Sequence, residues 1–385
     1  MFGLKNNSSD LLTWAKVDYY IDIDKQQKKG NIPVNIGICT GGGDCPGLNA
    51  VIRAVTRHAI LNYNMKVFGV ECSINGIMTT PPAVRELTLN DVSGILLKGG
   101  TILGTSNAGT PFKDPETGAK GISNALANWK TLGLDCLIVV GGDGTQRMAV
   151  MLQDAGMPIV GIPKTIDNDY EPTDVSIGFM TAVEVASEAI SRLHSTAEAH
   201  SRVMVAEVMG RDAGFIALHA GIASAANIIL VPEIPFSYDA IIKAMESRRK
   251  RGRNFSVVVV AEGAHEVGKE PKFRSSSTGS IHLGGIADEV AREIHGRAKI
   301  DTRVTVLGHI QRGGSPAPLD RILATAFGVH AVDLVAAKKF GRVVGYRGGE
   351  ITSRKYGEFA SEARRLSLKD PFLLAAEAIG ISLGR

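Results

Sequence analysis

The sequence predicts an α/β protein in which mostly parallel sheets are covered by helices on both faces. Short runs rich in β-branched residues recur, glycine or polar turn residues follow them, and helix-length segments separate them. The chain has 385 residues, 44% of them hydrophobic, which suffices for two domains. Its 44 glycines are a larger share of the chain than the ~7% usual in proteins. They follow no Gly-X-Y period. We assign this excess to tight turns and close backbone approaches.

The predicted strands follow one another along most of the chain. They cover residues 34–39, a run ending before Glu71, and residues 137–140, 158–162, 202–208, 228–231, 256–261 and 303–307. Residues 48–62 and 181–198 repeat apolar positions at helical spacing and are predicted helices. In sheets of this kind ligands bind at the carboxyl ends of the strands. The segments that follow the strands are therefore the candidate sites.

The strand and helix pattern also suggests how the chain divides. We expect an N-terminal arm at 1–33, a first domain at 34–178 completed by about 311–345, a second domain at 179–310 and a C-terminal extension at 346–385. Both domains are predicted to be Rossmann-like, with the active site in the cleft between them.

Charge and aromatic content argue against a nucleic-acid partner. Lys and Arg number 43 and Asp and Glu 39, a net charge of +4, and aromatics make up only 5% of the chain. A mild excess of this kind suits anionic ligands in general. The densest basic cluster, Arg248 to Arg251, is interpreted as a solvated helix end.

The cysteines and apolar segments predict a cytoplasmic protein without a membrane span. Cys39, Cys45, Cys72 and Cys136 form no Cys-x-x-Cys pair, so they are interpreted as reduced thiols, most of them buried. The first 30 residues are polar and lack the apolar region of a signal peptide. Residues 213–232 contain no charged residue, which raises the question of a membrane span. His219, Asn227 and two glycines favour instead a buried helix that runs into a strand.

The first glycine-rich loop, Thr40-Gly-Gly-Gly-Asp-Cys-Pro-Gly-Leu-Asn-Ala50, follows the first strand and precedes a helix. Glycines let backbone N–H groups approach an anion, and the helix N-terminus adds a favourable dipole. The loop matches neither a Walker A loop nor Gly-x-Gly-x-x-Gly. Phosphate binding and a tight structural turn both remain open. Glu71, placed like a ribose-binding acid, also leaves a dehydrogenase open.

A second loop, Gly141-Gly142-Asp143-Gly144-Thr145, follows the strand at 137–140. A carboxylate between glycines can reach a hydrated Mg²⁺ while the backbone admits phosphates. The alternative is that Asp143 caps the next helix.

The third loop is Pro163-Lys164-Thr165-Ile166-Asp167-Asn168-Asp169. On an extended segment, carboxylates two residues apart point the same way, and beside phosphate one can accept a hydroxyl proton. Surface turns are also rich in Asp and Asn. The spacing alone leaves a turn and a catalytic pair equally open.

Basic groups near later strands complete the pattern. They are Arg202, Arg211 in Met209-Gly210-Arg211, Arg303, and His309 with Arg312 in His309-Ile310-Gln311-Arg312. Each alone is typical of a surface residue, yet an arginine fork suits phosphate oxygens. Together with the glycine loops and carboxylates, they indicate a phosphotransferase whose nucleotide faces a phosphorylated acceptor.

Six segments, in order and spacing, resemble the 6-phosphofructokinase family from about residue 34 to residue 344. They are Gly42-Gly43-Asp44-x-Pro46-Gly47-x-Asn49-Ala50, Gly141-Gly142-Asp143-Gly144, Pro163-x-Thr165-Ile166-Asp167-Asn168-Asp169, Met209-Gly210-Arg211, Pro232-Glu233 and Gly308-His309-Ile310-Gln311-Arg312-Gly313-Gly314. The third and last are the most specific. The resemblance implies a kinase that phosphorylates the 1-hydroxyl of fructose 6-phosphate with ATP and Mg²⁺.

The resemblance also implies roles for individual residues. Asp167 would take the sugar hydroxyl proton, with Thr165 and Asp169 placing the substrates, and Arg211 would line the transferring phosphoryl group. The nucleotide phosphates and Mg²⁺ would be held by Gly43, Gly142, Asp143 (the metal ligand), Gly144, Thr145 and Lys164. Fructose 6-phosphate would be held by Ile166, Arg202, Met209, Gly210, Glu233, Arg303, His309, Ile310, Gln311 and Arg312. In the family the equivalents of Arg202 and Arg303 come from a neighbouring subunit, which implies a homo-oligomer, usually a tetramer.

Departures from the family pattern leave alternatives open. Gly144 favours ATP, because pyrophosphate-dependent members carry Asp there, whereas Lys164 is typical of those members. We weigh Gly144 more heavily, since a carboxylate at 144 would clash with ATP and repel it. Asn107 replaces a phosphate-bridging arginine, and His194 an effector-site arginine. A pyrophosphate-dependent enzyme and a non-catalytic sugar-phosphate sensor are therefore the alternatives.

Overall fold

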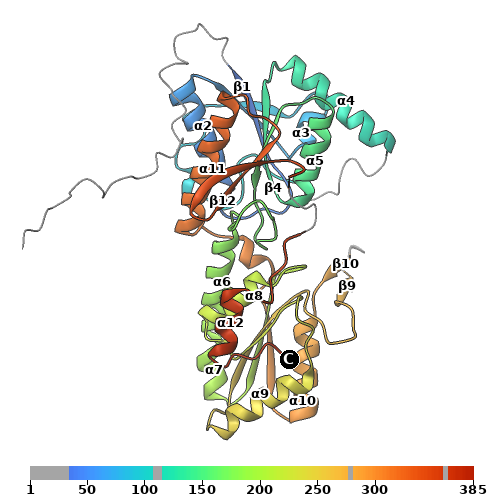
Figure 1. Cartoon of the computed structure of the whole chain (residues 1–385), viewed down its shortest axis with the longest axis vertical. Helices are drawn as coiled ribbons and strands as arrows, with labels where there is room; N and C mark the ends of the chain where they lie inside the picture. Colours follow the sequence, from blue (N-terminus) through green and yellow to red (C-terminus); the bar gives the residue numbers. More distant parts are fainter. Residues whose placement is uncertain (1–33, 107–114, 276–280, 359–362) are drawn as a thin grey trace, which may run out of the picture.

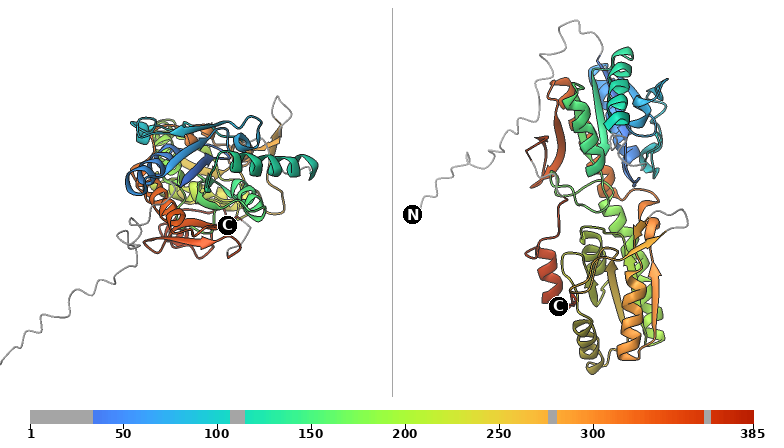
Figure 2. Two further views of the ribbon diagram at one scale, coloured as in Figure 1. Left: turned by 90° about the horizontal axis from the view of Figure 1, so that it is seen from above. Right: turned by 90° about the vertical axis from the view of Figure 1, so that its right-hand side faces the viewer.

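The structure is a computed structural model that describes residues 34–106, 115–275, 281–358 and 363–385 (Figure 1). Its described part contains two α/β bodies, one around the sheet with β1 and β4 and one around the sheet between α6 and α10, stacked along the long axis of the molecule (Figures 1 and 2). The predicted α/β class with mostly parallel sheets is confirmed.

The upper body is built on a seven-stranded sheet with the order β13-β12-β5-β4-β1-β2-β3. The strands are β1 (Asn35–Thr40), β2 (Lys66–Val70), β3 (Val84–Leu87), β4 (Cys136–Gly141), β5 (Ile159–Pro163), β12 (Arg342–Arg347) and β13 (Glu350–Lys355). The inner pairs are parallel and the edge strands β3 and β13 are antiparallel. Both faces of β4 are buried along its whole length, as its unbroken apolar sequence requires.

Helices cover both faces of this sheet (Figure 1). They are α2 (Leu48–Tyr63), α3 (Asn75–Met78), the 3₁₀ turn η1 (Ile95–Leu97), α4 (Pro115–Thr131), α5 (Asp143–Asp154) and α11 (Pro318–Ala336). Alternate strand residues feed two separate cores: Ile138 packs in the core that includes α2 and α11, and Val139 in the one that includes α5. At Gly328 a Cβ would lie 2.7 Å from the Cβ of Ala54, so glycine lets α11 approach α2.

The lower body contains a parallel four-stranded sheet with the order β11-β6-β8-β7. Its elements are α6 (Phe179–Ser191), α7 (Leu193–Ala199), β6 (Val203–Val208), α8 (Phe215–Ala223), β7 (Ile228–Leu230), α9 (Tyr238–Lys250), β8 (Ser256–Ala261), α10 (Ile286–Ala298) and β11 (Thr302–Val306), with a hairpin of β9 (Phe273–Ser275) and β10 (Ile281–Leu283). The single helix expected over 181–198 is two consecutive helices that meet at Arg192.

The apolar segment at 213–232 forms α8 followed by β7, as predicted. Phe215, Ile216 and Leu218 are buried in the core. Over the described ranges, none of the helices has both the length and the apolar character needed to cross a membrane.

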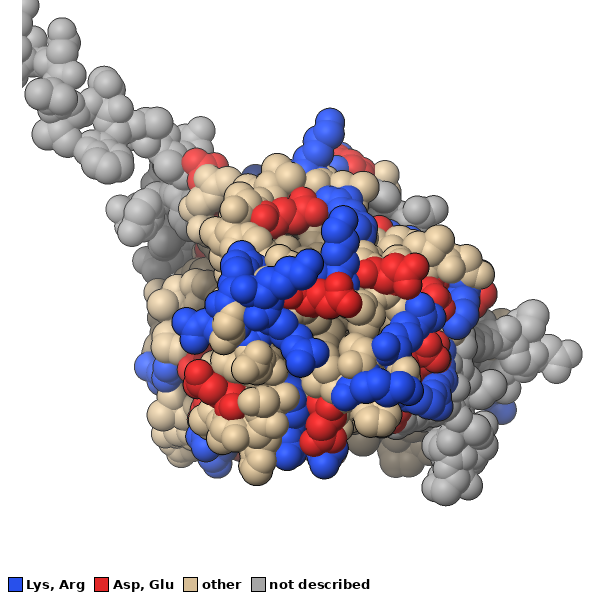
Figure 3. Space-filling view, turned by 90° about the horizontal axis from the view of Figure 1, so that it is seen from below, with Lys and Arg blue, Asp and Glu red and all other residues tan. Residues whose placement is uncertain are grey.

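The lower end of the molecule carries many charges of both signs (Figure 3). The last turn of α9 holds Arg248, Arg249 and Lys250, where cations are favourable at a helix C-terminus. At the other end of α9, Asp239 pairs with Arg297 of α10 (3.1 Å), which also pairs with Glu293 (3.1 Å). In the cluster itself Arg249, Lys250 and Arg251 are exposed, as a solvated helix end requires, whereas Arg248 is half-buried and lies over the ring of Phe255.

The chain crosses between the bodies three times. It enters the lower body at α6, returns through the 3₁₀ turn η2 (Gly308–Arg312) to α11, and finally descends to α12 (Pro371–Ala378), which packs on α8 (Figure 1). Between the last two crossings, β12 and β13 complete the upper sheet, at the limit between the predicted first domain and the C-terminal extension.

Candidate active site

Parallel pairing brings the three glycine and carboxylate loops to one edge of the upper sheet. Gly41 N donates to Val140 O (2.9 Å), which joins the end of β1 to the end of β4. Lys164 N donates to Gly141 O (3.1 Å), which joins the end of β5 to β4. The loops are thus neighbours at the carboxyl ends of the strands, where the sequence places the site.

The first loop is packed closely by groups from distant parts of the chain. A Cβ at Gly43 would lie 2.6 Å from Nη1 of Arg312, and the same Nη1 donates to Asp44 O (3.2 Å). Lys164 Nζ donates to Gly43 O. A side chain at Gly43 would therefore meet the guanidinium of Arg312, while Lys164 approaches the carbonyl of the same residue.

The second loop is open. Gly142 lies at the N-cap of α5 without a side-chain cap, and Asp143 occupies the first turn, where its carboxylate bonds Arg147 (Nε–Oδ1, 3.0 Å). Gly144 is exposed, and a Cβ built on it meets no atom within 4 Å. The space next to Gly144 is free in this chain, and a side chain there would project into it.

The third loop differs from the geometry that the sequence suggested. Residues 165–169 form a turn rather than an extended segment, and Asn168 adopts a left-handed conformation with φ of 54°. Asp167 N donates to Thr165 Oγ1 (3.2 Å), and Thr165 Oγ1 donates to Asp169 Oδ1 (3.0 Å). These hydrogen bonds hold the backbone of Asp167 and the carboxylate of Asp169 in the turn, so period-two alternation is the wrong reason for the placement of the two residues.

Asp167 is the most perturbed carboxyl of the site. Its Oδ1 is shielded from solvent and has no hydrogen-bond partner among the described residues, although the residue as a whole is only half-buried. Its pKa is raised to about 7, mainly by burial and then by the charge of Asp169, while the charge of Arg312 opposes the rise. Such a group is an acceptor near neutral pH, as a general base requires.

The neighbouring groups are shifted for the same reason. Burial raises the pKa of Asp169, and its hydrogen bond from Thr165 opposes that rise. Lys164 is buried, which lowers the pKa of its ammonium, while the charge of Asp44 is among those that favour it. At all three groups burial is therefore the largest cause of the shift in pKa.

The lower body contributes residues from the carboxyl end of β6. Met209 N bonds Gln311 Oε1 (3.4 Å), and Gly210 adopts φ of 139°, with a Cβ there only 2.8 Å from Ala213 O. Arg211 is exposed and lies 3.4 Å from Asp212. The charge of Asp212 also contributes to the raised pKa of Asp167, which places this segment within electrostatic reach of the turn.

Comparisons with known proteins agree on one family. Residues 35–335 match the model of the family described as Phosphofructokinase. The chain belongs to this family.

The curated relatives of this chain differ in the phosphoryl donors that their names give. The chain is 45% identical to an ATP-dependent 6-phosphofructokinase of Spirochaeta thermophila, over 90% of this chain and 97% of that one. It is 47% identical to a pyrophosphate–fructose 6-phosphate 1-phosphotransferase of Amycolatopsis methanolica, over 86% and 96%. The predicted resemblance to 6-phosphofructokinase is confirmed.

Solved phosphofructokinase structures have a similar fold. A Pichia pastoris phosphofructokinase in the T-state is 34% identical with a TM-score of 0.75, covering 86% of this chain, which spans 36% of the yeast chain. A pyrophosphate-dependent phosphofructokinase from Marinobacter aquaeolei has a TM-score of 0.75 at 19% identity, over 91% of this chain and 92% of that one. The second likeness shows the fold alone.

Within one chain, several residues expected to hold the sugar phosphate do not join the turn. Arg202 and Arg303 both lie beside Asp301, at the amino end of β6 and β11 and opposite the glycine loops. Glu233 accepts hydrogen bonds from Gly214 N (3.0 Å) and Leu366 N (2.8 Å).

The remaining expected residues divide between surface and core. His309 is exposed, as is Ile310, whereas Gln311 and Ile166 are buried. Asn107 lies outside the described residues. His194 contacts Ser224 O through Nε2 (2.7 Å), a bond within the lower body.

Glu71, the candidate ribose-binding acid of a dehydrogenase, forms an ion pair with Arg85. Its Oε1 accepts from Nε of Arg85 (3.1 Å) in a partly exposed ion pair between β2 and β3. The family match excludes the dehydrogenase alternative for this loop.

One residue that contacts the turn, Arg364, was not predicted from the sequence. Arg364 donates to three backbone carbonyls of the segment that follows Asp167. A lone arginine in a polar stretch, almost 200 residues away in sequence, carries no local pattern that reveals this contact.

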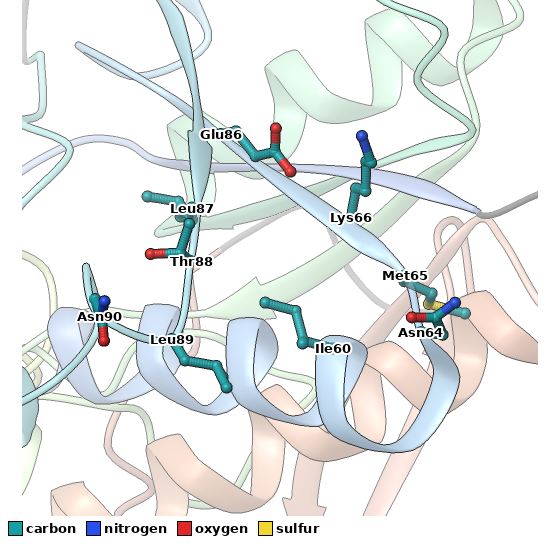
Figure 4. Close-up of a pocket in the computed structure, with 9 residues that line it drawn as sticks. All are labelled: Ile60, Asn64, Met65, Lys66, Glu86, Leu87, Thr88, Leu89 and Asn90. Atoms are coloured by element: carbon teal, nitrogen blue, oxygen red, sulfur yellow. The ribbon is translucent and has the colours of Figure 1, made fainter.

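A surface pocket of about 540 Å³ lies elsewhere (Figure 4). It is lined by Ile60, Asn64, Met65, Lys66, Glu86, Leu87, Thr88, Leu89 and Asn90. Lys66 begins β2, so the pocket opens at the amino end of that strand, opposite the edge where the glycine loops meet. We do not assign it to catalysis.

Proposed function

We propose that this chain is an ATP-dependent 6-phosphofructokinase, which transfers the γ-phosphoryl group of ATP to the 1-hydroxyl of fructose 6-phosphate. The products are fructose 1,6-bisphosphate and ADP. The observation that supports this best is the Oδ1 atom of Asp167, which is shielded from solvent, has no hydrogen-bond partner in the described part of the chain and lies beside two glycine loops. An acceptor atom of this kind suits a substrate hydroxyl.

In this proposal Asp167 accepts the hydroxyl proton as the sugar oxygen attacks the phosphorus. Thr165 and Asp169 are joined by a hydrogen bond that holds the turn, and both position the substrate. Arg211 is free to approach the transferring phosphoryl group because it is exposed at the end of β6. Positioning and charge stabilisation then supply most of the catalysis.

The nucleotide phosphates are assigned to the first two glycine loops. The backbone of Gly43 and of residues 142–145, Gly144 and Thr145 included, approaches them, with Lys164 adding a cation. The residues fit Mg²⁺ held in the manner usual for this ion, by one carboxylate together with phosphate oxygens and water. Asp143, partly exposed in the first turn of α5, is that carboxylate, and the ion would neutralise phosphate charge.

Fructose 6-phosphate is assigned to residues of the turn after β5, of the lower body and of η2. The residues are Ile166, Met209, Gly210, Glu233, His309, Ile310, Gln311 and Arg312. Because Arg202 and Arg303 lie at the opposite edge of the lower sheet, we infer that they serve the site of a neighbouring subunit in a homo-oligomer, a dimer or tetramer. Light scattering should then detect an oligomer. Arg303→Ala should raise the KM for fructose 6-phosphate while leaving the KM for ATP unchanged.

A second candidate function differs from the first in its phosphoryl donor, which would be pyrophosphate. Lys164 and the 47% identity to the Amycolatopsis enzyme favour pyrophosphate. The open space at Gly144 favours ATP, since it leaves room for a further phosphate. We therefore propose ATP as the donor, and the cytoplasm as the location, which suits four free cysteines.

The proposal is tested with the purified chain, Mg²⁺, ATP and fructose 6-phosphate. We expect fructose 1,6-bisphosphate and ADP in equal amounts, quantified by ³¹P NMR. Binding of fructose 6-phosphate without product, with either ATP or pyrophosphate, would favour the non-catalytic sensor instead.

A further inference from the structure

The last 22 residues connect the catalytic turn to the lower body. Arg364 N donates to Asp169 O (2.6 Å) in the upper body. Two residues later Leu366 N donates to Glu233 Oε1 (2.8 Å), and further on Ser382 bonds Asn227 and Ile229 beside β7. This tail, residues 364–385, therefore contacts the turn of Asp167 at one end and the lower sheet at the other.

The side chain of Arg364 is the main link. Its Nη2 donates to Asn168 O (2.7 Å) and Asp174 O (3.1 Å), and its Nη1 donates to Thr173 O (3.0 Å). Its guanidinium carbon also lies 4.9 Å from the ring centroid of Phe215, the first residue of α8. One planar group thus binds three carbonyls of the upper body and a ring of the lower body.

These bonds fall where the backbone needs support. Asn168 holds a left-handed conformation between the two carboxylates, which is uncommon for a residue other than glycine. Its own side chain accepts from Ser176 N (2.9 Å) and donates to Asp174 O (3.1 Å). Arg364 closes the same turn from outside, by binding the carbonyl of Asn168 itself.

Other ion pairs anchor a different part of this segment. Arg354 of β13 binds both oxygens of Glu171 (2.8 Å each), and Arg347 lies 3.5 Å from Glu171. These contacts hold residue 171, beyond the turn, and involve only the upper body. Arg364 alone among these three arginines bonds the residue between Asp167 and Asp169.

We propose that Arg364 is a positioning residue, which fixes the turn carrying Asp167 and couples its position to the lower body through Phe215 and the tail. The proposal rests on the assignment of Asp167 as the base. A base must lie at hydrogen-bond distance from the reacting hydroxyl, and a misplacement of about 1 Å can lower rates by about 10²-fold. Loss of the guanidinium should therefore affect kcat more than nucleotide binding.

The experiment compares Arg364→Ala and Arg364→Lys with a matched control, Arg385→Ala. Arg385 belongs to the same tail, but its guanidinium binds Glu377 of α12 (2.8 Å) and does not contact the turn. Two quantities are measured: hydrogen–deuterium exchange of peptides covering 165–176 without substrate, and kcat and KM with substrates. Lysine keeps the charge but cannot bond three carbonyls together.

We expect Arg364→Ala to speed exchange in 165–176 and to lower kcat about 10- to 100-fold, with the KM for ATP within about threefold. Arg364→Lys should lie between Arg364→Ala and the wild type, and Arg385→Ala should match the wild type. Unchanged exchange, a kcat within twofold of the wild type, or an equal loss in Arg385→Ala would each overturn the proposal. Activity retained by Asp167→Asn would instead overturn the base assignment, while the exchange result would still report on the restraint.

Discussion

The loops after β4 and β5 lie side by side yet are built in opposite ways. The loop after β4, residues 141–145, has three glycines, an exposed Gly144 and open space next to it. The turn after β5, residues 165–169, is tied by side-chain hydrogen bonds and by Arg364. The first leaves room for a ligand, whereas the second fixes one carboxylate.

The electrostatics of the two loops differ in the same direction. Asp143 is partly exposed and pairs with Arg147, whereas the Oδ1 of Asp167 is shielded from water and its pKa rises to about 7. An accessible carboxylate suits a hydrated cation and a desolvated one suits proton transfer. The contrast suggests that the first loop determines the donor and the second performs the chemistry.

The largest expected effect is at the fixed carboxylate. Asp167→Asn keeps the shape of the side chain but cannot accept the hydroxyl proton. We expect kcat to fall by about 10²- to 10⁴-fold with the KM for fructose 6-phosphate within a few-fold. Steady-state kinetics measure this, with the exposed Asp154→Asn on α5 as the control. A kcat near that of the wild type would show that another group takes the proton.

The open loop is tested next. Gly144→Asp should place a carboxylate in the free space beside the nucleotide phosphates and raise the KM for ATP at least about tenfold, through repulsion of more than ~1.4 kcal/mol. Gly296→Asp is the matched control, because this helical glycine of α10 also has no neighbour within 4 Å. If both variants bind ATP like the wild type, Gly144 does not discriminate between donors.

The raised pKa of Asp167 predicts the pH dependence of the rate. The base must be ionised, so kcat/KM should rise with pH and level off above about pH 7. A profile of kcat/KM from pH 5 to 9 checks this. A rate already constant at pH 5 would mean that the base ionises at its usual low pKa.

The same shift predicts a stability effect of opposite sign to the activity effect. The folded pKa lies above the ordinary value of 3.8, so the folded state holds the proton more tightly, and stability is lost as pH rises towards 7. Asp167→Asn removes this penalty. Its Tm should therefore exceed that of the wild type at pH 8, and the difference should shrink towards pH 4. A lower Tm at pH 8 would contradict the burial of an ionised carboxylate.

The smallest effect is expected behind the open loop. Tyr356 donates its hydroxyl proton to Gln146 Oε1 (2.6 Å), and Gln146 donates to Gly141 O (3.2 Å). Tyr356→Phe should cost about 1–2 kcal/mol in the free energy of unfolding in urea, because a buried acceptor loses a donor. We expect kcat within about twofold of the wild type. A large fall in kcat with normal stability would show that the open loop also needs exact placement.

The sequence predicted the fold class and the three loops because both follow from local patterns. Apolar runs mark buried strands, and parallel pairing brings their carboxyl ends to one edge. It did not predict the left-handed turn at Asn168, since a two-residue spacing fits a strand and a turn equally well. Arg364 was beyond reach because its contacts are backbone carbonyls far away in sequence. The family resemblance placed Arg202 and Arg303 at the sugar phosphate, but within one chain both lie beside Asp301, away from the turn.

The most direct test of the contrast is the donor itself. Initial rates of fructose 1,6-bisphosphate formation should be measured with ATP and with pyrophosphate side by side, at equal Mg²⁺ and saturating fructose 6-phosphate. The open space at Gly144 predicts turnover with ATP and a far lower kcat/KM with pyrophosphate. Turnover with pyrophosphate alone would contradict the account and give the decisive role to Lys164.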